Sequence, residues 1–181
     1  MSHFAVTAVG ADRPGIVAAV TGVLDQKGFN LEDSSMTILR GQFAMMLVVD
    51  TPPGVGTGEL EAALAGPAGE LDLVVTVRPA PQPARPSVSA PEEASWTVSV
   101  YGADHPGIVH GVASLLAARA VNIVDLTTRM VGTPENPVYT MVLEVTLPAG
   151  ADPRDFERAL AAKAGELGVT CRLHPSEADI L

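Results

Sequence analysis

One segment of this chain occurs twice, and the repeat limits the folds that the chain can adopt. Residues 4–38 align with residues 96–130 at an offset of 92 positions, and 12 of those 35 positions are identical. A period this long indicates two copies of one domain, because solenoid repeats are about 20–50 residues long. The identical positions of the first copy are Val6, Gly10, Ala11, Asp12, Pro14, Gly15, Ile16, Val17, Val20, Leu24, Asn30 and Asp33.

The longest identical stretch joins an apolar strand pattern to an amphipathic helix pattern. Residues 10–17 return as residues 102–109 with a single change, Arg13 to His105. Pro14 and Pro106 suit the first turn of a helix, where the missing N–H group costs nothing, and we predict a helix start there. Gly28 fits the position after the first helix, whereas Ala120 at the same place predicts a different helix end in the second copy.

Each copy shows the same order of elements. Strand patterns at 4–9 and 96–101 precede the helices, and hairpins follow at 31–39 with 43–51 and at 123–131 with 138–147. A second helix is predicted at 58–64 and at 152–167, where Pro153 sits at the first helical position, and a last strand at 71–78 and 169–174. The second copy has a four-residue insertion around 132–137, which we expect to lengthen a hairpin loop.

The order βαββαβ predicts an α+β protein made of two ferredoxin-like domains, each with two helices on one face of an antiparallel four-stranded sheet. We expect the domains at 1–78 and 95–181, joined by a Pro-rich linker at 79–94. Domains of about 80 residues bury a core with little margin, so we expect the sister domain or a second chain, in a homodimer, to cover exposed sheet faces. Met45, Met46 and Met141 are predicted to lie in the core.

Composition excludes several functions. The formal charge is −10, shared equally by residues 1–78 and 79–181, so neither half has a basic surface for direct nucleic-acid binding. No apolar run approaches about 20 residues and no secretory leader pattern is present, so we expect a cytoplasmic protein without membrane contact. The single cysteine, Cys171, excludes an intrachain disulfide and is expected to pack in a strand. No catalytic motif, metal site or cofactor motif is recognisable, and we expect no enzyme.

The stretch Gly-Ala-Asp-Arg/His-Pro-Gly-Ile-Val, followed by Asn30 or Asn122, resembles the turn of ACT domains. The resemblance implies small regulatory modules that bind amino acids. A tandem pair of such domains over most of the chain resembles the glycine cleavage system transcriptional repressor family, in which the repressor acts through another transcription factor. It therefore implies a sensor of a small amino acid, such as glycine or serine, that relays occupancy to a protein partner.

The residues of the turn support such a site independently of the resemblance. The first N–H groups of a helix lack intrahelical partners and carry partial positive charge, which suits a carboxylate. A ligand could then bridge this loop of one domain and the asparagine of a neighbouring domain. The candidate ligand-binding residues are Asp12, Arg13, Gly15, Ile16 and Asn30 in the first copy, and Asp104, His105, Gly107, Ile108 and Asn122 in the second. Arg13 and His105 differ, so the two sites are predicted to be related but not equivalent.

Simpler explanations exist for each residue type. The aspartates could cap the helices, the glycines could serve close packing of helix on strand, and the asparagines could serve turn geometry alone. Arg13 and His105 could be solvated loop charges. Two other functions also stay open: a detached regulatory subunit of an amino-acid or folate enzyme, and an oligomerisation module that binds no ligand.

Overall fold

Strands and helices follow the same order in both halves of the chain. The computed structural model describes residues 2–81, 95–133 and 135–176, and it divides the chain into unit 1, residues 1–87, and unit 2, residues 88–181. Unit 1 contains β1 (Ser2–Ala11), α1 (Ile16–Gln26), β2 (Asn30–Leu39), β3 (Gln42–Thr51), α2 (Thr57–Leu71) and β4 (Leu73–Pro79). Unit 2 contains β5 (Ser95–Gly102), α3 (Ile108–Ala118), β6 (Asn122–Thr133), β7 (Asn136–Thr146), α4 (Pro153–Leu167) and β8 (Val169–Pro175).

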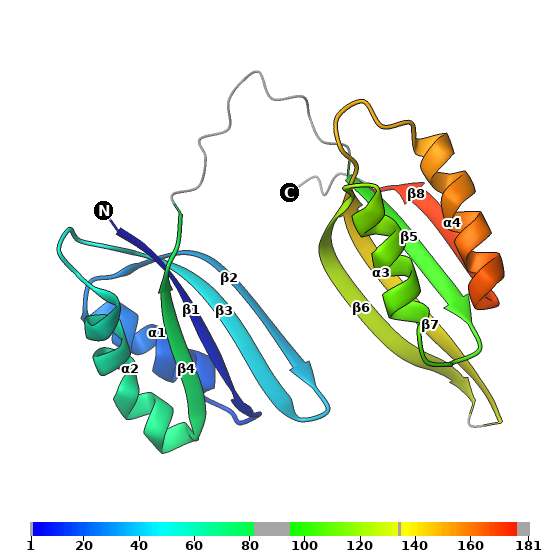
Figure 1. Cartoon of the computed structure of the whole chain (residues 1–181). Coiled ribbons are helices and arrows are strands. Elements are labelled where there is room, and N and C mark those ends of the chain that lie inside the picture. Colours follow the sequence, from blue (N-terminus) through cyan, green and yellow to red (C-terminus); the bar gives the residue numbers. More distant parts are fainter. Residues whose placement is uncertain (1, 82–94, 134, 177–181) are drawn as a thin grey trace. The chain divides into compact units, whose positions relative to one another are not determined.

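Each unit is a four-stranded antiparallel sheet with two helices on one face (Figure 1). The strand order is β2-β3-β1-β4 in unit 1 and β6-β7-β5-β8 in unit 2. The predicted pair of ferredoxin-like βαββαβ folds is therefore confirmed. The predicted linker, 79–94, lies mostly outside the described residues, although Pro79 belongs to β4 and the Ala80 N–H donates to the His3 carbonyl. The boundaries of the domains stay a prediction.

The core of each unit lies between the sheet and the helices, because alternate residues of a strand face opposite sides. In unit 1, Ile16, Val20 and Leu24 of α1 are buried on the sheet, as the helical spacing predicts. Burying one such side chain stabilises the fold by about 1.5–3 kcal/mol. The strand residues that meet them are Phe4, Val6, Phe43, Met45, Leu47, Val49, Leu73 and Val77.

The opposite face of sheet 1 carries apolar side chains that the described residues of its own unit leave uncovered. Met46 points there and is 54% exposed, so the prediction that it lies in the core is wrong, whereas Met45 and Met141 are buried. Met46 alternates with Met45 along β3, and a strand buries only one of two neighbours when helices cover a single face. Val9 and Val74 are exposed on the same face.

Helices α1 and α3 begin later than predicted. Gly15 and Gly107 are their N-caps, with φ of 96° and 100°, so the prolines precede the helices instead of occupying the first turn. By contrast, α4 begins at Pro153 as predicted, and the Asp152 side chain caps it by accepting from the Arg154 N–H at 2.9 Å.

Two other predicted details are wrong. Helix α2 runs to Leu71 rather than Leu64, through Gly66 and Pro67, residues that usually end a helical pattern. The insertion of unit 2 extends the strands instead of the loop: Gly132 pairs with Pro137 and Thr133 with Asn136, so the hairpin ladder continues to the turn. Helix packing and strand pairing outweigh these local signals.

Candidate functional site

The helix-start loop of unit 1 follows β1 directly. The Asp12 N–H donates to the Gly41 carbonyl at 2.9 Å, which holds the loop against the β2–β3 turn. The buried side chain of Ile16 fixes the other end of the loop to the core. Gly15, between them, is exposed and has a φ of 96°, a conformation that favours glycine. Gly107 and Ile108 repeat this geometry in unit 2.

Backbone N–H groups at these loops are left without intrahelical acceptors. The Gly15 carbonyl accepts from the Ala19 N–H at 2.9 Å, and the Gly107 carbonyl from the Gly111 N–H at 2.8 Å. These are the first intrahelical hydrogen bonds. The N–H groups of the three residues after each glycine therefore have no acceptor within the helix, and they carry the partial positive charge of the helix N-terminus. An anionic group can approach them because an added Cβ at Gly15 or Gly107 would meet no atom of the described residues within 4 Å.

Two of the simpler explanations fail at these loops. Asp12 and Asp104 are exposed and do not cap the helices, since neither N-cap has a side-chain hydrogen bond. Close packing does not explain Gly15 and Gly107 either, because the space beside them is open. Close packing does explain Gly10, where a Cβ would lie 2.9 Å from the Asp72 carbonyl oxygen.

The two asparagines lie at the other end of their units. Asn30 is the first residue of β2 and stands in register with Asp50, which itself pairs with His3 near the start of β1. From His3 to Ala11, where the helix-start loop begins, β1 rises about 26 Å at about 3.3 Å per residue. One amino acid cannot touch both ends of a unit. The asparagine and the loop can share a small ligand only if they come from two different units.

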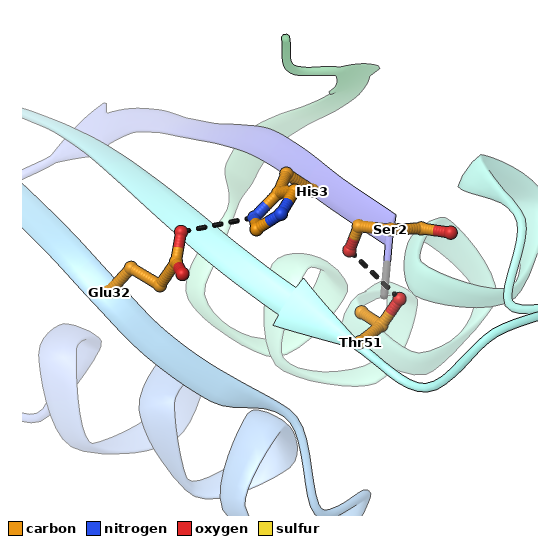
Figure 2. A network of polar contacts seen from close by, with 4 residues as sticks. All are labelled: Ser2, His3, Glu32 and Thr51. Atoms are coloured by element: carbon orange, nitrogen blue, oxygen red, sulfur yellow. Dashed lines mark hydrogen bonds and ion pairs between the residues drawn. The ribbon is translucent and has the colours of Figure 1, made fainter. Parts of the chain in front are cut away.

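A polar cluster surrounds Asn30 on the sheet face away from the helices. The His3 Nδ1–H donates to Glu32 Oε2 at 3.1 Å, across β3 (Figure 2). On the opposite face of the sheet, the side chain of Thr51 is buried and its hydroxyl donates to the Ser2 carbonyl at 3.2 Å. No local sequence pattern indicates this cluster, since only the strand register brings His3 and Asp50 to Asn30.

Comparisons with known proteins agree with this architecture. The sequence model of the ACT domain matches residues 2–78. The glycine cleavage system transcriptional repressor of Escherichia coli strain K12 is 30% identical over 167 residues, which cover 91% of this chain and 85% of the relative. The chain belongs to this ACT-domain family. A UPF0237 protein of Methanopyrus kandleri is 43% identical over 79 residues, 43% of this chain and 88% of that protein.

A solved structure extends the likeness over almost the full length. The crystal structure of an unknown protein from Galdieria sulphuraria is 30% identical, with a TM-score of 0.78, and the match covers 97% of this chain and 99% of that one. Both ACT units are thus within the region of similarity.

The two ACT units differ at the one mismatched loop position. His105 Nε2–H donates to the Leu167 carbonyl at the end of α4 at 2.7 Å, and Nδ1–H donates to the Pro106 carbonyl at 3.0 Å. The Pro106 carbonyl, then the Leu167 carbonyl, raise the pKa of His105 above its usual value, and Asp104 adds to this. The side chain of Arg13 is exposed and has no hydrogen bond or ion pair among the described residues.

Other chemistry is sparse in the ACT units. No group of three or more His, Cys, Asp or Glu side chains among the described residues is arranged to hold a metal ion. Within the same residues, no helix is both long and apolar enough to cross a membrane. Cys171 lies in β8 as predicted, and burial raises the pKa of its thiol, which disfavours the reactive thiolate.

Proposed function

We propose that this chain is an amino-acid-sensing regulatory protein that binds a small amino acid between ACT units and relays its occupancy to a protein partner. The observation that carries the proposal is the open helix-start loop, where Gly15 and Gly107 leave first-turn N–H groups accessible to a carboxylate. The relationship to the glycine cleavage system transcriptional repressor supports a regulatory role and favours glycine or serine as the ligand.

The ligand bridges two units in this proposal. Its carboxylate binds the loop residues Gly15 and Ile16, or Gly107 and Ile108, of one unit, and its other end binds Asn30 or Asn122 of another. Because the loop and the asparagine of a unit lie at opposite ends of its sheet, binding stabilises one pairing of units. The ligand can shift the equilibrium between paired and unpaired units only by the difference in its affinity for the two arrangements.

The partner is a protein rather than an operator sequence. The net charge of −10 opposes direct contact with a DNA backbone, so regulation of glycine cleavage genes would act through a transcription factor. We further propose that the chain forms a homodimer, acts in the cytoplasm and has no enzymatic activity of its own.

Calorimetry of the full chain against the twenty standard amino acids tests this function. We expect at least one small amino acid to bind, and the double substitution Asn30→Ala and Asn122→Ala to weaken it about tenfold or more, since each removes hydrogen bonds to a charged ligand. Ser114→Ala, on the exposed side of α3, serves as the matched control and should bind normally. Absence of binding by all twenty would leave the oligomerisation module as the better function.

A further inference from the structure

Asn30 lies in a row of polar side chains that crosses three strands of sheet 1. The register pairs His3 of β1 with Asp50 of β3, and Asp50 with Asn30 of β2. Directly opposed residues of antiparallel strands share a face, with their Cβ atoms about 5 Å apart. The neighbouring Phe4 and Val49 point into the core, so this row lies on the face away from the helices.

The row is partly closed from solvent. Glu32, at the bulge of β2, reaches across β3 to His3 (Figure 2). The side chain of His3 is only 10% exposed. On β3, which lies between β2 and β1, Asp50 Oδ1 is buried and has no hydrogen-bond partner among the described residues. A buried carboxylate oxygen without a donor is costly, and such an atom in a native protein calls for a missing partner.

The missing partner must be a hydrogen-bond donor and is best a cation. Glu32 pairs with the His3 imidazole and Asp50 stands in register with His3, and none of the ion pairs among the described residues joins either carboxylate to lysine or arginine. The amide of Asn30 adds an acceptor at the exposed end of the row. A primary ammonium group has three donors and one positive charge, and it matches this set.

Unit 2 lacks the charges at the corresponding positions. Its row consists of Ser95, Thr146 and Asn122, and Val124 occupies the place of Glu32 at the bulge. Asn122 is therefore flanked by hydroxyl groups where Asn30 is flanked by carboxylates.

We propose that His3, Glu32 and Asp50 form an ammonium subsite beside Asn30, and that the neutral row of unit 2 forms none. The inference rests on the proposed function. It fixes the orientation of the ligand: the ammonium group binds beside Asn30, and the carboxylate binds the helix-start loop of another unit. The site built on Asn30 then requires a free amino group, whereas the site built on Asn122 does not.

The test compares Asp50→Asn with the matched substitution Thr146→Val in the full-length chain. Each variant is titrated in a calorimeter with the twenty standard amino acids and, as a probe without an amino group, with acetate. Asp50→Asn is expected to weaken amino-acid binding about tenfold or more, because it removes a charged acceptor. Thr146→Val is expected to change the affinity by less than about twofold, and neither variant should alter the response to acetate.

The outcomes separate the inference from the function on which it rests. If an amino acid binds the unmodified chain and Asp50→Asn binds it equally well, the subsite is wrong and the sensor function stands. If none of the twenty binds the unmodified chain, both are wrong.

The unmodified chain gives a second measurement that does not depend on the folding of a variant. At saturation with the amino acid, the carboxyl carbon resonance of Asp50 and the imidazole nitrogen resonances of His3 should shift in NMR spectra. Unchanged resonances at both residues would overturn the subsite.

Discussion

At the scale of single residues, Ala120 is strained: with Arg40 and Asp72, it is one of three described residues other than glycine that have a positive φ. It has a φ of 54° and ends α3 with the same hydrogen bonds that Gly28 makes after α1, although alanine was predicted to force another arrangement. The Gly28 N–H donates to Asp25, and the Ala120 N–H to Ala117. A left-handed backbone costs a residue with a Cβ about 1–2 kcal/mol.

Ala120→Gly should therefore stabilise unit 2. We expect the free energy of unfolding to rise by about 0.5–1 kcal/mol, since part of the relief is offset by the greater freedom of glycine in the unfolded chain. Urea denaturation followed by the fluorescence of Trp96, the single tryptophan, reports on unit 2. Gly28→Ala is the matched control. It should lower the free energy of unfolding of unit 1, measured by urea denaturation followed by circular dichroism. An unchanged or lower midpoint for Ala120→Gly would contradict the account.

The contacts of His105 predict that the stability of unit 2 depends on pH. Both ring nitrogens donate to carbonyl oxygens, which requires the doubly protonated ring and raises its pKa above the usual value of about 6.5. Because the folded-state pKa is the higher one, the stabilisation is complete below about pH 6.5 and is lost as the pH rises through the folded-state value.

Substitution at His105 tests this dependence. The urea midpoint of the unmodified chain, measured by Trp96 fluorescence, should fall as the pH rises above about 6.5, and His105→Gln should flatten the fall. His110→Gln, on the exposed side of α3, is the control and should keep the slope. An equal slope in the His105 variant would show that this contact does not control stability.

At the scale of elements, the sequence predicts what depends on local pattern. The α1 face of Ile16, Val20 and Leu24 and the capped start of α4 at Pro153 follow from residue spacing and capping chemistry. The start of α1 was misplaced because Pro14 suits a first helical turn, and only the positive φ of Gly15 shows that the helix begins after it.

The parts that could not be predicted depend on contacts between distant segments. The hydrogen bond of His105 to Leu167 spans 62 residues, and no local pattern at either residue indicates it. The row of His3, Asp50 and Asn30 likewise exists only once the strand register is fixed. A register shift of one residue would move each side chain to the opposite face.

At the scale of the whole molecule, the separation of loop and asparagine within a unit is the decisive feature. Strand β1 ends where the helix-start loop begins, and α1 then carries the chain back to the opposite end of the sheet, where β2 begins (Figure 1). In the proposed function, the identical asparagines of both units are therefore half-sites that need a second unit. The exposed Val9, Met46 and Val74 offer apolar surface that a second chain can cover.

The most direct test of this account is a crystal structure of the full chain grown with the amino acid that binds most tightly in calorimetry. We predict ligand density with its carboxylate about 2.7–3.2 Å from N–H groups of a Gly15 or Gly107 loop, and with its other end at Asn30 or Asn122 of a different unit. Density at saturating ligand that touches neither the loops nor the asparagines, or that lies within a single unit, would contradict the account.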